Sequence, residues 1–300
     1  DPCSSAAKPA DNDGDQMSDL NDTDDDNDGV LDTADQFQFD AANGTATQLP
    51  WVRNWNPGDA PDGKFGNSGF PGVQLTSKGK GFIADKVHPG GAGGLLTLYA
   101  TGGSNYSSSN NQDNALQVGF DARQTVTIQT RIADPFNGVT PDAGKSGGIF
   151  FGLDEDNYVK LVVVGKEGDN KIGTVVFAVE NEGNYSTPYW IKPVDVHVGN
   201  GHTLDLFLVL DPATQRVVVQ YRDTSDGPAA ITTIGEIDTR TTPWMAKLFK
   251  LGAAAGVLNT NNSAATFGVA FDYFKIEQST PPPQQPLPAP AKIYLPFVLR

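Results

Sequence analysis

Cysteine is almost absent from this sequence of 300 residues, in which Cys3 is the single example. One cysteine cannot form an internal disulfide, so a disulfide framework is excluded, and Cys3 is either a free thiol or an intermolecular link. Basic residues are also scarce, with 21 Lys and Arg against 36 Asp and Glu and a net charge of -15. Because no basic patch is visible that would neutralise a phosphate backbone, nucleic acid is excluded as a main partner.

Long apolar runs are missing as well, and without a stretch of about 18 apolar residues no membrane span is expected. The chain starts at Asp1 without a methionine, which predicts a mature secreted product whose export segment has been removed. The sequence is instead rich in turn-forming residues, with 33 Gly and 21 Pro. Together with frequent Thr, Val and Asn, this composition predicts an all-β fold. As a mature secreted product, the protein is expected outside the cell or on its surface.

Short apolar runs bounded by Gly, Asn, Asp and Pro occupy residues 41–278. In the run 125–132, Val126, Ile128 and Ile132 share one face with Thr130, as expected for a strand with one side against a core. About twelve or more such strands predict two packed antiparallel sheets, with hairpins between residues 160 and 191. The clearest expected strands are 94–101, 124–132, 147–153, 158–164, 172–180, 203–210, 217–222 and 267–276.

An acidic segment over residues 11–40 carries most of the net charge. It holds 12 Asp and no Glu, Lys or Arg, which leaves -3 for the rest of the chain. Within it the pattern D-x-D-x-D-x-x-x-D-x-x-D occurs twice, 13 residues apart. Calcium is a hard ion that takes six to eight oxygens, and carboxylates at positions 1, 3 and 5 of a tight loop can converge on it. A solvated like-charge run is the alternative, but solubility does not require this spacing.

Each copy therefore predicts a calcium loop in which position 7 contributes a backbone carbonyl. The second copy has Gly29 at position 6, where the loop turns sharply, and Leu31 at position 8 as an apolar anchor, whereas the first copy has Gln16 and Ser18 there. Repulsion among the aspartates predicts a segment that is disordered in chelator and ordered with Ca2+. The expected ligands are Asp11, Asp13, Asp15, Met17, Asp19 and Asp22 in the first loop, and Asp24, Asp26, Asp28, Val30, Asp32 and Asp35 in the second.

The segment DNDGDQMSDLNDTDDDNDGVLDTADQFQFD resembles the thrombospondin type 3 calcium repeats of bacterial secreted proteins, including the D-x-F-x-x-D ending at Asp35, Phe37 and Asp40. The resemblance covers about a tenth of the chain. It implies structural calcium wrapped by a chain with little regular secondary structure, not an EF-hand sensor flanked by helices. The sequence agrees, because Pro9 and the polar residues before Asp11 offer no incoming helix.

The stretches GGIFFGLDEDNYVKLVVVG and FGVAFDYFKIE resemble laminin-G-like or concanavalin-A-like jelly-roll domains of secreted bacterial proteins, over most of residues 50–278. Such domains bind glycans or proteins, or accompany glycosidases, and the fold alone does not decide among these roles. The expected architecture is thus a two-sheet antiparallel jelly-roll sandwich with an irregular calcium module before it and a Pro-rich tail after it. The expected parts are a leader (1–10), the calcium repeats (11–40), the sandwich (41–278), a Pro-rich spacer (279–292) and an apolar strand (293–300).

No catalytic site is expected. The best candidate is GEIDTRT, since laminarinase-like glycosidases of this fold carry E-I-D-x-x-E or E-x-D-x-E on one strand. Here Glu236 and Asp238 share a strand face, but Arg240 and Thr241 follow, and the second carboxylate that retaining hydrolysis requires is missing. The three histidines are isolated in the sequence and are expected on the surface or in loops. We therefore expect a protein that is not an enzyme.

Glycan binding needs an aromatic platform beside polar groups, and two clusters could supply one. Core or rim packing is the alternative for each, because Trp and Tyr are frequent there. The candidate residues are Trp51 and Trp55 in WVRNWNPGD, and Tyr189 and Trp190 in STPYWIKP.

The tail ends in IYLPFVLR, an apolar strand on a Pro-rich spacer. This strand either folds back on its own sandwich, is exposed, or completes the sheet of a neighbouring molecule, and the last option would generate a filament. The candidate assembly residues are Ile293, Tyr294, Leu295, Phe297, Val298 and Leu299. Two functions are left open. One is a calcium-stabilised structural or adhesive protein that associates with itself or with other matrix or surface proteins, which we favour, and the other is a lectin-like module that binds polysaccharide.

Overall fold

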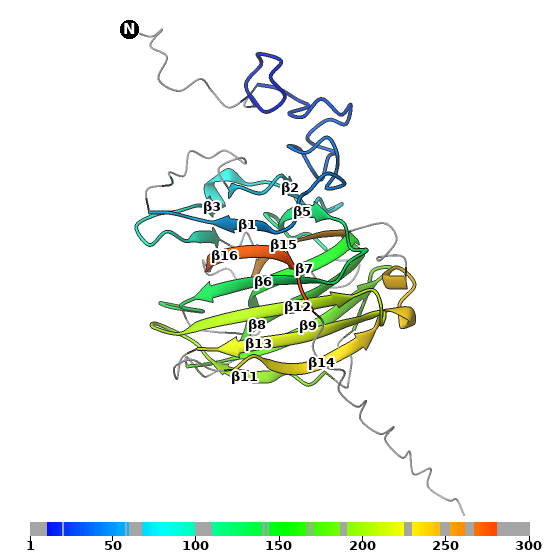
Figure 1. The fold of residues 1–300 in the computed structure, drawn as a ribbon. Coiled ribbons are helices and arrows are strands. Elements are labelled where there is room, and N and C mark those ends of the chain that lie inside the picture. The colour runs from blue at the N-terminus through cyan, green and yellow to red at the C-terminus, as the bar shows by residue number, and fades with distance from the viewer. Residues whose placement is uncertain are drawn as a thin grey trace, which may run out of the picture.

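The structure is a computed structural model that describes residues 11–19, 21–57, 59, 68–99, 110–139, 142, 144–166, 169, 171–186, 191–224, 230–246, 253–261 and 267–280. Its body is a sandwich of two antiparallel sheets, and the acidic segment sits at one end of it as irregular loops (Figure 1). The two-sheet all-β architecture expected from the sequence is confirmed. None of the helices in the described part of the chain has the length and hydrophobicity needed to cross a bilayer.

The first sheet, sheet A, has the strand order β14-β13-β12-β6-β16-β4-β3, and β1 also pairs with β16. Its strands are β14 (Thr232–Asp238), β13 (Arg216–Asp223), β12 (Thr203–Asp211), β6 (Val126–Ala133), β16 (Gly268–Gln278), β4 (Leu96–Tyr99), β3 (Val87–His88) and β1 (Trp51–Asn54). Two 3-10 helices, η2 (Ala84–Lys86) and η4 (Thr239–Thr241), flank β3 and β14.

The second sheet, sheet B, has the order β10-β9-β8-β7-β15-β5-β2, and β11 also pairs with β9. Its strands are β10 (Asn184–Ser186), β9 (Ile172–Asn181), β8 (Asn157–Gly165), β7 (Lys145–Asp154), β15 (Ala253–Asn261), β5 (Leu116–Phe120), β2 (Gly72–Val73) and β11 (Val194–His197). The expected hairpins are confirmed, since β8 pairs with β9 and β9 with β10.

The main core lies between the two sheets. Val126, Ile128 and Ile132 of β6 are fully buried in it, as the alternation of that strand predicts. Sheet B also buries part of its opposite face, where Phe150 and Tyr158 belong to a second, smaller apolar cluster. Burial on both faces explains why β7 and β8 read as nearly continuous apolar runs rather than as alternating ones.

The end of the acidic segment is bonded to the outer edge of sheet B. The backbone N–H of Val73 in β2 donates to the carbonyl of Gln36 (3.1 Å), and the N–H of Phe39 donates to the carbonyl of Pro71 (3.1 Å). A little further along, the backbones of Gly44 and Gly119 of β5 approach so closely that a Cβ on Gly44 would lie 2.3 Å from the Cα of Gly119. The acidic segment is therefore fixed to the sandwich at its carboxyl end.

Candidate metal centre

The two copies of the aspartate pattern fold into loops with matching hydrogen bonds. At position 2, the N–H of Asn12 donates to Asp19 Oδ1 (2.8 Å), and the N–H of Asp25 donates to Asp32 Oδ1 (2.9 Å). At position 7, the N–H groups of Met17 and Val30 donate to the position-5 carboxylates, each at 2.7 Å. Short aspartate side chains that bond to the backbone a few residues away favour such tight loops.

Both loops pass through the left-handed region at positions 4 and 6. The φ angles are 79° at Gly14 and 81° at Gln16 in the first loop, and 56° at Asn27 and 92° at Gly29 in the second. Side chains with a Cβ are strained in this region, and Asn tolerates it better than most. Gln16 is therefore the residue at which the first loop departs from the preferred chemistry.

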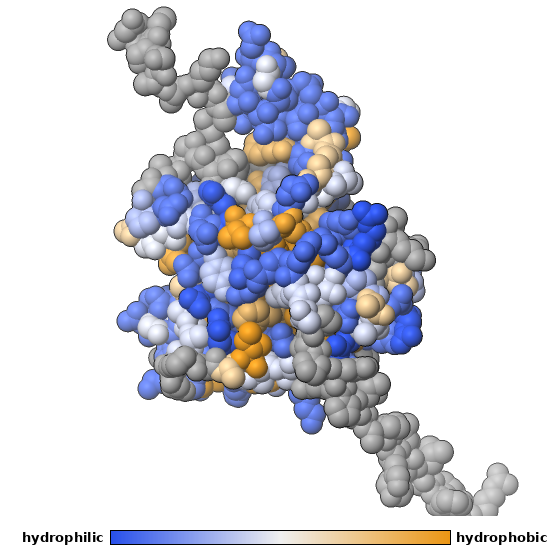
Figure 2. All heavy atoms as spheres, in the orientation of Figure 1, coloured by the Kyte–Doolittle hydropathy of each residue, from blue (hydrophilic) through white to orange (hydrophobic). Residues whose placement is uncertain are grey.

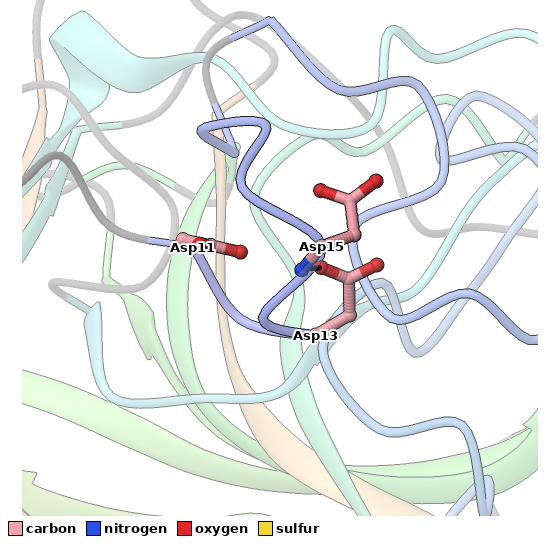
Figure 3. A group of neighbouring side chains, drawn as sticks. All are labelled: Asp11, Asp13 and Asp15. Atoms are coloured by element: carbon pink, nitrogen blue, oxygen red, sulfur yellow. Dashed lines mark hydrogen bonds between the residues drawn. The ribbon is translucent and has the colours of Figure 1, made fainter.

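These backbone turns direct the carboxylates at positions 1, 3 and 5 to one point in each loop. One oxygen from each of Asp11, Asp13 and Asp15 lies within 4.8 Å of the others, and Figure 3 shows the three side chains gathered on a single turn of the chain. Asp24, Asp26 and Asp28 form the same arrangement in the second loop. The structure thus brings together the position 1, 3 and 5 residues that the spacing predicts.

The second loop also buries carboxylate oxygens without hydrogen-bond partners. Asp24 Oδ1, Asp25 Oδ1 and Asp26 Oδ2 are all inaccessible to solvent and unpartnered. Burial raises the pKa of Asp25 to about 7 and that of Asp26 to about 6, and neighbouring aspartates add to both increases. Burying an ionised carboxylate without compensation costs several kcal/mol, so these oxygens require either a proton or a cation.

The outer predicted ligands surround the two triads. Asp22 accepts from the N–H of Asp24 (3.1 Å), and Asp35 accepts from that of Phe37 (2.8 Å). Burial, opposed in part by backbone hydrogen bonds, raises the pKa of Asp32 and of Asp35. A cluster of hard oxygen donors with net negative charge suits Ca2+, which accepts flexible geometry and many carboxylates.

Two features of the loops differ from the sequence expectation. Leu31 is not an apolar anchor, because it is 56% exposed and belongs to neither apolar cluster. The spacing also passes over Asp25, which the structure places among the most buried residues of the segment at 7% exposure. In the sequence, Asp25 belongs to the unbroken run Asp24–Asp26. The calcium pattern assigns Asp24 and Asp26 as ligands and skips the residue between them.

The surface around the loops is strongly hydrophilic, in keeping with their composition (Figure 2). Met17 and Val30 at position 7 are exceptions, with 48% and 41% exposure. That the backbone carbonyls of Met17 and Val30 are calcium ligands stays a prediction.

The aromatic candidates for glycan binding are placed differently. Trp55 is 4% exposed, donates from Nε1 to the carbonyl of Ser68 (2.9 Å) and stacks on Phe70, so its ring offers no face to a sugar. Trp51 is half-buried against Phe70 and Phe274. Trp51 of β1 thus packs on Phe274 of β16, and both rings pack on Phe70. Tyr189, Trp190 and the tail residues Ile293, Tyr294, Leu295, Phe297, Val298 and Leu299 lie outside the described residues.

The carboxylates of the GEIDTRT strand are held by arginines. Glu236 accepts from Arg216 Nη1 (2.7 Å), and Asp238 accepts from Arg240 Nε (2.8 Å) in a two-pronged pair. The hydrogen bonds from Arg240 lower the pKa of Asp238 below its ordinary value.

The histidines are not all isolated. The rings of His197 and His202 stack with centroids 5.7 Å apart, a contact between β11 and the loop before β12 that sequence distance cannot reveal.

No protein-family model matches the sequence, and no curated protein matches it. The Bacteroides ovatus structure described as Xyloglucan PUL GH43B superposes with a TM-score of 0.51 at 11% identity, over 78% of this chain and 40% of that one. The GH43 BlXynB protein from Bacillus licheniformis gives 0.48 at 15% identity, over 62% and 33%. The CBM2 module of the evolved Dit of Lactobacillus casei BL23 phage J-1 gives 0.40 at 11% identity, over 77% and 91%.

The chain spans 33% to 40% of the length of the two GH43 proteins. At 11% identity, the likeness to the Bacteroides ovatus protein concerns the fold alone and agrees with a β-sandwich.

Proposed function

We propose that this chain is a non-catalytic, calcium-binding, extracellular β-sandwich protein in which ions held by the acidic loops fix that segment on the edge of sheet B. The observation that carries the proposal is the pair of carboxylate triads together with buried aspartate oxygens that have no hydrogen-bond partner. Only a proton or a cation relieves such a cluster, and oxygen-only ligands at this charge density favour Ca2+ at extracellular concentrations. The resemblance to thrombospondin type 3 repeats supports the same reading.

Calcium titration of the chelator-treated chain by isothermal calorimetry tests this proposal. We expect binding of at least one ion per loop, and loss of the second-loop ion in the double variant Asp26→Asn/Asp28→Asn. Asp85→Asn is the matched control, because its side chain is 76% exposed and pairs only loosely with Lys86 (3.7 Å). The proposal would be rejected if CaCl2 at millimolar concentration gave no heat of binding and if elemental analysis found no metal in the chain before chelator treatment.

The non-catalytic part of the proposal draws on the GEIDTRT strand. An acid and a nucleophile need an unengaged carboxylate pair about 5 Å apart. Here Arg216 and Arg240 occupy Glu236 and Asp238, respectively. A structural or adhesive role follows from a rigid sandwich with a calcium-stiffened extension, and its partners would be matrix or surface proteins or further copies of the chain.

A second candidate, polysaccharide binding, rests on a pocket beside the acidic segment. The pocket has a volume of ≈ 350 Å³ and is lined by Phe37, Phe120 and Arg123, among others. Arg123 forms a two-pronged pair with Asp121, and such a polar pair can orient sugar hydroxyls. The shared fold with a protein described as a xyloglucan-locus GH43 protein is compatible with this role.

Glycan-array binding that is lost in Arg123→Ala would support the second candidate. Arg240→Ala is its matched control, because Arg240 forms the same kind of exposed pair with Asp238 away from the pocket. Absence of binding to any polysaccharide would remove it.

Self-assembly through residues 293–300 stays a prediction. Electron microscopy of the calcium-loaded chain, with and without residues 279–300, tests it: filaments that persist after the deletion would contradict it.

A further inference from the structure

The acidic segment contains one buried carboxylate that the calcium pattern does not use. Asp25 occupies position 2 of the second loop and is 7% exposed, whereas its counterpart in the first loop, Asn12, is exposed. The backbone geometry is the same at both positions, because each N–H donates to the position-9 carboxylate. The two positions therefore share this backbone hydrogen bond but differ in side chain and in burial.

The side chain of Asp25 has no partner within the described part of the chain that would neutralise it. Its Oδ1 is inaccessible to solvent and accepts no hydrogen bond. The aspartates that raise its pKa, after burial itself, are Asp32 of its own loop and then Asp19, Asp22 and Asp13 of the first loop. The carboxylate of Asp25 is thus buried near carboxylates of both loops.

A second contact places the two loops against each other at this point. Asn27, two residues after Asp25, donates from Nδ2 to Asp13 Oδ2, and Asp13 is the position-3 carboxylate of the first loop. The first-loop triad is consequently within reach of side chains from the second loop. A site that needs six to eight oxygens gains one from outside its own loop if Asp25 turns toward it.

We propose that Asp25 is a shared calcium ligand, which completes the first-loop site from the second loop and couples the filling of the two sites. This proposal rests on the proposed calcium binding. When the second loop closes around its ion, the bond from the Asp25 N–H to Asp32 fixes the position of Asp25, so the first site is preorganised. By linkage, the first ion favours the second to the same extent.

Calorimetric titration with CaCl2 of the full-length Asp25→Asn variant tests the proposal. Asn keeps the shape of the side chain and removes its charge. We expect the first-loop affinity to fall on the order of tenfold, because ligand charge sets calcium affinity, and the Hill coefficient to fall to about 1. Asn12→Ala, at the same position of the first loop, is the matched control and is expected to bind like the wild type.

Two backgrounds assign the effect to a loop. In the first background, Asp11→Asn/Asp15→Asn disables the first loop. Adding Asp25→Asn should then change the calcium affinity of the second loop less than about twofold, because Asp25 is proposed to be a ligand of the first-loop site, which is already lost. With Asp28→Asn weakening the second loop instead, adding Asp25→Asn should still weaken the first. An equal loss in both backgrounds, or an unchanged affinity in Asp25→Asn, overturns the shared ligand while leaving calcium binding intact.

Failure of the proposed function would look different, because the wild type itself would then bind no calcium. Far-UV circular dichroism checks that the sandwich of each variant is folded. If Asp25→Asn lacks the wild-type spectrum, Asp25→Ser replaces it with the same expected losses.

Discussion

At the scale of single residues, the two loops differ most clearly at position 6, which is Gln16 in the first loop and Gly29 in the second. Gln16 and Gly29 have φ angles of 81° and 92°, a region that costs an ordinary side chain about 1–2 kcal/mol. Space is not the constraint, because a Cβ on Gly29 would meet no atom within 4 Å. The first loop therefore keeps its conformation against backbone strain that the second loop avoids.

Replacing Gln16 with Gly is expected to relieve this strain. Part of the gain is offset by the extra freedom of glycine in the unfolded chain, leaving about 1 kcal/mol, or roughly fivefold tighter calcium binding by the first loop. The reciprocal variant Gly29→Gln is the matched control and should weaken the second loop by a similar factor. Calorimetric affinities measure both, and a tighter second loop in Gly29→Gln would contradict the argument.

Calcium binding is also expected to depend on pH. The pKa values of Asp25 and Asp26, about 7 and about 6, lie above the ordinary 3.8. Carboxylates with raised folded-state pKa values stabilise the metal-free fold in their protonated form, and that contribution is lost as the pH rises through about 6 to 7. Calcium must displace these protons, so its affinity should rise between about pH 5 and pH 7.5.

Calorimetry at about pH 6 in two buffers of different ionisation enthalpy measures the released protons directly. Identical heats in the two buffers would show that no proton leaves and would contradict the pH argument.

At the scale of elements, β5 contacts residues 43–44, just after the acidic segment, and this contact depends on Gly119 and Gly44. A Cβ on Gly119 would lie 2.6 Å from the Cα of Gly44 and 2.9 Å from the carbonyl oxygen of Asn43, both backbone atoms that cannot rotate away. Gly72 of β2 is similar, because its Cβ would lie 2.1 Å from the carbonyl oxygen of Gln36. Close backbone approach, not φ, is the reason for glycine at positions 72 and 119.

Gly119→Ala is therefore expected to push residues 43–44, and with them the carboxyl end of the acidic segment, away from sheet B, at a cost of about 1–3 kcal/mol. Calcium should still bind the loops but should stabilise the sandwich less. Gly93→Ala is the control, because its Cβ would meet the side chain of Leu95 at an ordinary 3.6 Å. Thermal melts with and without calcium compare the two variants, and equal calcium-dependent shifts would rule out the docking role of Gly119.

At the scale of the whole molecule, the sandwich and the loops rest on different forces. The sandwich is held by a core of buried apolar side chains between its sheets, to which the segment adds the partly buried Phe39. Among their described residues, the loops have hydrogen bonds between aspartates and backbone but no apolar core of their own, and repulsion between like charges opposes their folding. The sandwich should therefore stay folded in chelator under conditions in which the loops unfold.

Hydrogen exchange in chelator and in calcium tests this division. In chelator we expect the amides of residues 11–35 to lose protection while those of β6 and β12 keep it. The melting temperature should fall by several degrees, at about 2–4 °C for each kcal/mol of binding energy lost. Protection of the loops that is unchanged by chelator would show that they fold without metal.

The amino-acid sequence by itself determined the strands and the carboxylate triads. Alternation along β6 and the apolar runs of β7 and β8 specify strands locally, because side-chain direction follows the backbone period. The spacing of Asp11, Asp13 and Asp15 likewise brings their carboxylates together within one turn, since aspartate side chains bond to nearby backbone.

Tertiary structure alone decided what depends on distant contacts. Trp55 became a core residue through Phe70 and the carbonyl of Ser68, 13 residues away, and Leu31 became exposed because no element covers it in the described structure. The burial of Asp25 depends on how the two loops lie against each other. The burial of a residue depends on which distant parts of the chain pack against it, and a local sequence pattern contains no information about those parts.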